Sequence, residues 1–280
     1  MRIVRIIDEM KNEILRRRAQ GESIGFVPTM GYVHEGHLSL IRESVKKNDC
    51  TVVSVYVNPT QFGPDEDYER YPRDLSRDAK ILTEEKVDYL FSPEDNKMYP
   101  KGYKTYVEVH DLQDVMCGAS RTGHFRGVCT VVLKLFNIIN PHRAYFGQKD
   151  AQQAVILKKM VEDLNVDVEI SVLPIVREKD GLALSSRNSL LNSEQRAAAL
   201  CLYESLQSAK NLISEGENNS DKIIDLIRNH IKKEKFARID YVVIVNKNNL
   251  KPLPKVRTNE TLIALAVYIG RVRLIDNIII

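Results

Sequence analysis

Short apolar runs alternate with amphipathic segments through the first 175 residues of the chain. The runs IGFVP at 24–28, CTVVSVYV at 50–57 and VDYLF at 87–91 are typical of strands buried within a sheet. Between them, the segments 36–47 and 73–85 show helical spacing. This order of strand, helix and strand predicts a parallel sheet covered by helices on both faces.

The same order continues on either side of these segments. An apolar run at 1–4 opens the chain, GVCTVVLKLFNIIN at 127–140 predicts a buried helix, and RAYFG at 143–147 and VEISVLP at 168–174 predict strands. Between these strands we expect a helix that begins near Asp150. Its inner face should carry four apolar residues, Ala154, Leu157, Val161 and Leu164. Ligands of such sheets bind beyond the carboxyl ends of the strands.

The pattern changes after about residue 177. A polar, turn-rich stretch leads to a helix near Ser193, where Asn192 and Gln195 have the spacing of a capping box. A second helix and three strands follow. We therefore predict an α/β core at 1–177 and a smaller α+β domain at 178–280.

Composition limits the classes of function. The hydrophobic fraction of 43% and the charged fraction of 28% are ordinary for a globular protein, and the net charge of +3 is too small and too evenly spread for a nucleic-acid surface. The four cysteines form no CxxC pair, which argues against a disulfide framework or a structural zinc site. The start of the chain does not resemble a signal peptide, and the apolar runs are too short to span a membrane. We expect a cytoplasmic protein.

The sharpest local feature is PTMGYVHEGHLSLI at 28–41. A strand ends, a turn with Gly31 follows, and His34-x-Gly36-His37 opens a helix. Helix N-termini present unpaired N–H groups and partial positive charge, which suits phosphate, and imidazoles there can donate further hydrogen bonds. The alternative is that both histidines are surface residues at a helix start.

A second feature follows the strand at 50–57. Asn58 and Gln61 in VNPTQF can hold the hydroxyl and carboxylate groups of a small polar substrate without a charge penalty. Asn-Pro also initiates turns, so a structural role is the alternative.

Two further segments could bind phosphate. In YFGQKDAQQA, Lys149 precedes a helix and could neutralise phosphate, while Asp150 and Gln153 have capping-box spacing or could face a cleft. In LALSSRN, the hydroxyls and Arg187 could clamp phosphate, although an exposed turn is the simpler interpretation. The chain has neither a GxxxxGK[ST] loop nor a GxGxxG turn, so a P-loop kinase or a Rossmann dehydrogenase loses its main support.

Together these motifs resemble the pantothenate synthetase (pantoate–β-alanine ligase) family. PTMGYVHEGH, VNPTQF, RTGHFRGV, AYFGQKDAQQ and LSSRN stand in that family's order and at its separations. The resemblance implies a Rossmann-like core of the HxGH nucleotidyltransferase type at 1–177, which binds nucleotide and pantoate, with a C-terminal α+β lid domain at 178–280. It also implies ATP, Mg²⁺ and a homodimer.

The resemblance also assigns roles by matching motif positions. Five residues are implied in catalysis, namely His34, His37, Lys149, Ser186 and Arg187. The residues implied in ATP binding are Met30, Gly31, Tyr32, Val33, His34, Glu35, Gly36, His37, Gly147, Gln148, Lys149, Asp150, Val176, Leu184, Ser185, Ser186 and Arg187. Those implied in binding pantoate and then β-alanine are Asn58, Gln61 and Gln153. No metal ligand is assigned.

Three positions depart from the family's pattern. Gln148 stands where the family usually has Glu, Leu184 where it has Met, and Thr122 where it has Pro. If residue 148 acts through its backbone, the first change loses nothing.

The resemblance implies attack of pantoate carboxylate on the α-phosphate of ATP, then attack of the β-alanine amine on the acyl-adenylate. Two other classes stay open. Another HxGH nucleotidyltransferase would keep the nucleotide in its product. A non-catalytic nucleotide-binding module would bind ATP without forming an adenylate.

Overall fold

The computed structural model describes residues 1–64 and 66–280. Six strands form one sheet in the order β1-β4-β3-β2-β5-β6, and each recorded pair is parallel. The strands are β1 (Arg2–Val4), β2 (Ile24–Thr29), β3 (Cys50–Val55), β4 (Tyr89–Phe91), β5 (Arg143–Gly147) and β6 (Glu169–Leu173). The chain runs outward from β2 through β3 to β4, then returns to place β5 on the other side of β2. The junction of β2 and β5 is therefore a topological switch point, where ligands of open α/β sheets bind.

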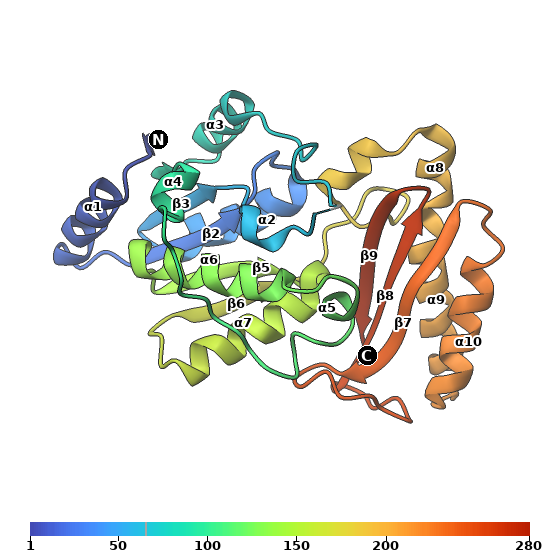
Figure 1. Cartoon of the computed structure of the whole chain (residues 1–280). Coiled ribbons are helices and arrows are strands. Elements are labelled where there is room, and N and C mark those ends of the chain that lie inside the picture. The colour runs from blue at the N-terminus through green and yellow to red at the C-terminus, as the bar shows by residue number, and fades with distance from the viewer. Residues whose placement is uncertain (65) are drawn as a thin grey trace.

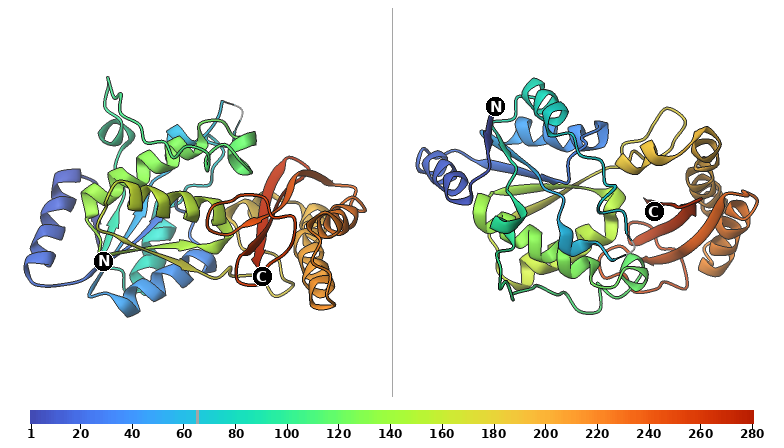
Figure 2. Two further views of the ribbon diagram at one scale, coloured as in Figure 1. Left: turned by 90° about the horizontal axis from the view of Figure 1, so that it is seen from below. Right: turned by 45° about the horizontal axis from the view of Figure 1, so that its top comes forward.

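Helices cover both faces of this sheet (Figures 1 and 2). They are α1 (Ile7–Ala19), α2 (Glu35–Lys47), α3 (Leu75–Glu84), α4 (Asp95–Met98), α5 (Cys117–Ser120), α6 (His124–Ile139) and α7 (Ala151–Asp163). One core cluster joins the sheet to α1, α6 and α7, and a second joins it to α2 and α3. The predicted parallel sheet with two covered faces is confirmed.

Two expectations about α7 are wrong. Within the described residues, Asp150 makes no side-chain cap to this helix, because the 3₁₀ turn η2 (Gln148–Asp150) comes first and the carboxylate lies 3.1 Å from Lys149 Nζ. Leu164 is 49% exposed because the helix ends at Asp163 and Leu164 stands beyond its last turn. Ala154 and Leu157 are buried as expected.

The C-terminal part has the predicted α+β layout. The helix expected near Ser193 is divided into α8 (Ser193–Ala198) and α9 (Leu200–Ser214), and α10 (Ser220–Ile231) follows. Asn192 and Gln195 cap α8 reciprocally, with N···O distances of 2.8 and 3.2 Å. Strands β7 (Ala237–Asn246), β8 (Thr261–Ile269) and β9 (Val272–Ile279) form an antiparallel sheet in chain order.

This small sheet is packed on both faces (Figure 1). One face shares a hydrophobic core with α8, α9 and α10. Side chains on the other face, including Val243 and Ala264, pack against residues of α7 and of the segment before α5. Burial on both faces explains why β8 reads as an almost continuous apolar run. No helix in the described part of the chain is long and apolar enough to cross a membrane.

Candidate active site

The HxGH segment lies directly after β2, at the switch point of the sheet. His34 is the N-cap of α2, and its Nδ1 accepts a hydrogen bond from the Gly36 N–H at 3.1 Å. The His34 N–H donates in turn to Nδ1 of His37 at 3.4 Å, and the two rings stack with their centroids 4.1 Å apart. Since both Nδ1 atoms accept, both neutral rings carry their proton on Nε2. The turn therefore provides two Nε2–H donors beside a helix N-terminus.

Burial keeps both rings neutral near pH 7. Desolvation, with Lys149 nearby, lowers the pKa of His34 to about 4. Desolvation, His34 and Lys149 together hold the pKa of His37 well below its usual value. The histidines can therefore act on phosphate as neutral hydrogen-bond donors.

A buried carboxylate holds the turn before the helix. Asp78 on α3 accepts hydrogen bonds from the backbone N–H groups of Tyr32 at 2.7 Å and Val33 at 2.9 Å. Gly31 and Tyr32 both have positive φ, at 84° and 52°. Arg77 donates to the Val33 carbonyl at 3.0 Å and its guanidinium lies over the Tyr32 ring. Sequence reasoning missed Asp78, because it stands in a polar segment that resembles a solvated helix face.

Asn58 and Gln61 lie together near Met30. The 3₁₀ turn η1 (Pro59–Gln61) places the Gln61 amide so that Nε2 lies 3.1 Å from the Met30 sulfur. Asn58 is 1% exposed, and its Nδ2 donates to the Gly127 carbonyl at 3.1 Å and to Gln61 Oε1 at 3.2 Å. Asn58 is thus engaged in orienting Gln61, whose amide contacts Met30 just beyond the end of β2.

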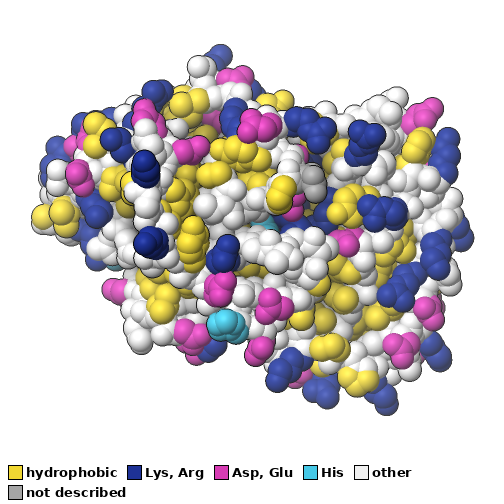
Figure 3. Space-filling model, viewed as in Figure 1, with side chains coloured by type: hydrophobic (Ala, Val, Ile, Leu, Met, Phe, Trp, Pro, Cys, Tyr) yellow, Lys and Arg dark blue, Asp and Glu magenta, His cyan; other side chains and the backbone are white. Residues whose placement is uncertain are grey.

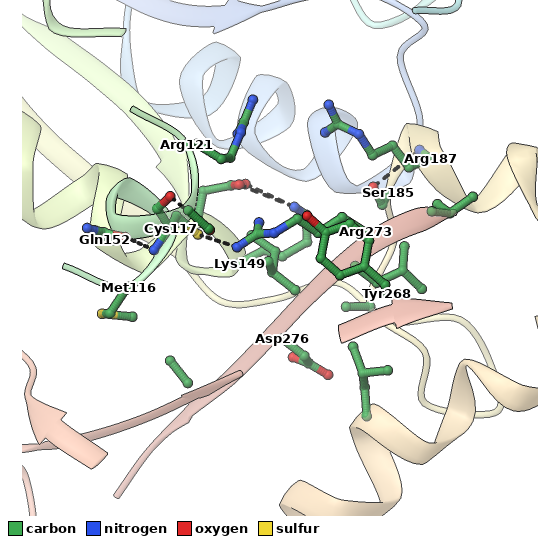
Figure 4. A pocket seen from close by; sticks show the side chains of 18 of the residues that line it. Met116, Cys117, Arg121, Lys149, Gln152, Ser185, Arg187, Tyr268, Arg273 and Asp276 are labelled. Carbon is green, nitrogen blue, oxygen red and sulfur yellow. Dashed lines mark hydrogen bonds and ion pairs between the residues drawn. The ribbon is translucent and has the colours of Figure 1, made fainter. Parts of the chain in front are cut away.

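A cavity of about 600 Å³ lies between the large sheet and the C-terminal part of the chain. Five of the residues predicted for the site line it, namely Lys149, Asp150, Gln153, Ser185 and Arg187. Basic side chains (Lys or Arg) and a histidine are visible in the central hollow of Figure 3. Figure 4 shows that Arg121, Lys149, Arg187 and Arg273 come to the cavity from separate elements.

The HxGH turn adjoins the cavity instead of forming its wall, as far as the described residues show. The connection is made by the 184–187 loop. A Cβ built on Gly36 would be 3.8 Å from Cβ of Leu184, so this loop passes over the helix start. The Leu184 N–H donates to the Val176 carbonyl at 3.0 Å. Ser186 is 9% exposed, with its Oγ 3.1 Å from the Tyr71 hydroxyl.

Two consecutive carboxylates hold the arginines at the cavity. Arg187 makes a bidentate pair with Asp67, both N–O distances being 2.9 Å. Arg121 pairs with Glu66 at 2.7 and 2.5 Å. Neither carboxylate was predicted, because Glu66 and Asp67 stand in an acidic stretch typical of exposed turns. The 3₁₀ turn η3 (Ser186–Leu190) begins beside Arg187.

His124 links this group of charges to Gln61. Its Nδ1 lies 2.8 Å from the Gln61 carbonyl and its Nε2 lies 3.0 Å from Arg121. The carbonyl can only accept, so Nδ1 carries the proton and Nε2 accepts from the guanidinium. Burial and Arg121 lower the pKa of His124 to about 4, which maintains this neutral form.

The fold and site define an α/β protein in which a helix start capped by two histidines follows β2 at the switch point of a parallel sheet, beside a cavity lined by Lys149 and Arg187. Comparisons with known proteins agree with this class. A sequence profile described as pantoate-beta-alanine ligase matches residues 2–279. The chain is 55% identical over 280 residues to a pantothenate synthetase of Caldicellulosiruptor saccharolyticus, covering 100% of this chain and 99% of that one.

Solved structures give the same result. The pantothenate synthetase of Thermus thermophilus superimposes with a TM-score of 0.94 at 43% identity and covers 99% of both chains. A pantoate-beta-alanine ligase of Francisella tularensis, complexed with "Beta-gamma ATP and Beta-alanine", superimposes with a TM-score of 0.80 at 36% identity, covering 100% of this chain and 97% of that one. The chain belongs to the pantoate–β-alanine ligase family, and it is an enzyme of that ligase class.

Proposed function

We propose that this cleft condenses (R)-pantoate with β-alanine at the expense of ATP, giving pantothenate, AMP and pyrophosphate through a pantoyl-adenylate. The observation that carries the proposal is the HxGH turn, with two neutral Nε2–H donors, beside the Leu184–Arg187 loop and Lys149. This arrangement would surround a polyphosphate with hydrogen-bond donors and positive charge. Family membership supplies the identity of the two acids.

The first step is attack of the pantoate carboxylate on the α-phosphate of ATP. Negative charge moves onto pyrophosphate in this step. Five side chains would stabilise it, namely His34, His37, Lys149, Ser186 and Arg187. Arg187 must exchange its Asp67 partner for a phosphate oxygen, and the guanidinium geometry suits both partners.

The side-chain amides of Gln61 and Gln153 would bind pantoate and β-alanine. Gln61 reaches Met30, and Gln153 lines the cavity from α7. We assign pantoate to these two amides, with Asn58 orienting Gln61. The β-alanine amine then attacks the mixed anhydride and AMP leaves. The chemistry requires no side-chain nucleophile, so positioning and electrostatics supply most of the rate.

Mg²⁺ would enter with the ATP phosphates, as is usual for an ion that binds through one or two carboxylates and keeps several waters. Among residues 1–64 and 66–280, no group of three His, Cys, Asp or Glu side chains could hold a metal ion. Asp150 fits a single-carboxylate role, since its side chain is 45% exposed and lines the cavity. The ion would supply charge neutralisation on the phosphates.

We further propose the ATP-binding residues Met30 to His37, Gly147 to Asp150, Val176 and Leu184 to Arg187, a homodimer, a C-terminal domain that begins near residue 178, and a cytoplasmic location. The four cysteines are buried free thiols, which fits a reducing compartment.

The test measures AMP and pyrophosphate release from ATP and Mg²⁺, omitting pantoate and β-alanine in turn. AMP release that requires both acids establishes the ligase. If pantoate does not stimulate turnover and a nucleotide-containing product accumulates with another acceptor, the chain is a different HxGH nucleotidyltransferase. Tight ATP binding without turnover would instead identify a non-catalytic nucleotide-binding module.

A further inference from the structure

The last strand of the chain, β9, packs against a different part of the protein on each of its two faces. Val272, Leu274 and Ile278 pack on the core that α8, α9 and α10 share with the small sheet. The residues that alternate with these, Arg273, Ile275 and Asn277, face the part of the protein that contains the large parallel sheet, because successive side chains of a strand point to opposite faces. Ile275 packs against the core of the large domain, and Arg273 Nη2 lies 3.4 Å from Cys117 Sγ.

Asn277 continues this second row and reaches the turn after β5. Its Nδ2 donates to the carbonyl oxygens of Gln148 and Lys149, each at 3.0 Å. Its Oδ1 accepts from Gln148 Nε2 at 3.1 Å. Asn277 is 3% exposed, so these three bonds occupy a buried amide. Both donors and the acceptor of one side chain are therefore used to hold two consecutive residues.

The neighbouring residue anchors the strand from its other face. Asp276, whose side chain is 1% exposed, forms a bidentate pair with Arg177 at 2.7 and 2.8 Å. Arg177 also donates to the Gly181 carbonyl at 3.0 Å. Figure 4 shows Asp276 on β9 at the same cavity as Lys149. The strand position of Asn277 is therefore supported by contacts other than those that Asn277 makes with the turn.

Resting on the proposed function, we propose that Asn277 is a positioning residue, whose amide fixes the Gln148–Lys149 backbone and thereby sets where the Lys149 ammonium meets the ATP phosphates. Lys149 has a long flexible side chain, so its reach depends on where its backbone is held. A small displacement of such a group is costly, since about 1 Å of misplacement can reduce a rate by about a hundredfold.

The pair also gives the Gln148 side chain a role in this chain. Gln148 Nε2 donates to Asn277 Oδ1, while both hydrogens of Asn277 Nδ2 go to carbonyls. A carboxylate at position 148 could not donate to Oδ1. In this chain Gln148 contributes both its backbone carbonyl and its side chain to the hydrogen bonds with Asn277.

The test uses the isosteric variant Asn277→Asp. It retains an acceptor for Gln148 but places a carboxylate oxygen against two carbonyls. We expect kcat/KM for ATP in pantoate-dependent pyrophosphate exchange to fall by roughly a hundredfold. The control Ile278→Val loosens the same strand from its opposite face. It should lower the thermal midpoint by about 2–4 °C and leave the exchange rate within about twofold.

A double-mutant cycle on ATP affinity distinguishes positioning from general damage. Lys149→Met and Asn277→Asp should each weaken ATP binding, and the double variant should bind about as tightly as Lys149→Met alone, because both changes act through one group. Additive losses would overturn the proposal, as would wild-type exchange by Asn277→Asp. Absence of pantoate-dependent exchange in the unmodified chain would refute the proposed function itself, which is a separate outcome.

Discussion

The HxGH turn and the Lys149 turn lie at the ends of neighbouring strands, but they are held in different ways. The HxGH turn is capped by its own residues, His34 and His37, and held by Asp78 on α3. The Lys149 turn is held by Asn277, 129 residues beyond Gln148 on the last strand. The HxGH turn therefore depends on its own capping residues and on α3 beside it, whereas the Lys149 turn depends on the last strand of the chain.

The largest loss of activity should come from a change in the HxGH turn. His37→Ala removes an Nε2–H donor from the helix start, so adenylate formation should fall by about 10²- to 10³-fold while the fold stays intact. Pantoate-dependent exchange of pyrophosphate into ATP measures this step, and circular dichroism checks the fold. The matched control His110→Ala changes an exposed histidine and should have no effect. Near-normal exchange by His37→Ala would refute the catalytic assignment.

Asp78→Asn tests whether the HxGH turn needs a partner outside its own motif. The amide keeps the shape but places N–H donors or a single acceptor against two backbone donors, so unfolding free energy should fall by roughly 1–3 kcal/mol and exchange should weaken by about tenfold or more. Urea denaturation and exchange kinetics measure the two effects.

Asp74 offers the matched comparison on the same helix. It caps α3 through a 2.9 Å bond from the Arg77 N–H and is exposed. Asp74→Ala should destabilise by about 1 kcal/mol without reducing exchange. Equal loss of exchange by the two variants would show that α3 as a whole, and not the Asp78 carboxylate, supports the turn.

Acid should lower the free energy of unfolding, because His34 is buried in its neutral form. His34 has its folded pKa lowered to about 4, so the unfolded chain binds the proton more readily. This contribution to stability is complete above about pH 6.5 and is lost as the pH falls toward about 4. Urea denaturation across this range should show the decline. His34→Asn keeps an N-cap and should give a shallower decline; an unchanged slope would contradict the assignment.

The smallest effect should come from Tyr71→Phe. It removes the hydroxyl that lies 3.1 Å from Ser186 Oγ, which holds the loop over the helix start. We expect a loss of about 1 kcal/mol in stability and a rise of a few-fold in KM for ATP. Steady-state kinetics and denaturation measure both, and a large fall in kcat would show that Tyr71 contributes directly to the reaction.

The parts that sequence could predict have strong local signals. The positions of the strands follow from short apolar runs, and His34, His37 and Lys149 stand where strands meet helix starts. Val176 and Leu184 were assigned through the resemblance, and the structure places their backbones in contact.

The parts that it could not predict are the polar residues that hold these groups. Glu66, Asp67, Asp78 and Asn277 all make contacts across distant positions in the chain, and such contacts have no period in the sequence. A buried carboxylate in a polar segment looks like a solvated one. The same ambiguity made Asp150 look like a helix cap, although its carboxylate lies beside Lys149.

The most direct test of the central claim is exchange of labelled pyrophosphate into ATP by the unmodified chain with pantoate present and β-alanine absent. We expect exchange that depends on pantoate, because the donors at the HxGH turn, Lys149 and Arg187 together complete the adenylate-forming step before the amine enters. Exchange that requires β-alanine, or that proceeds equally without pantoate, would contradict it.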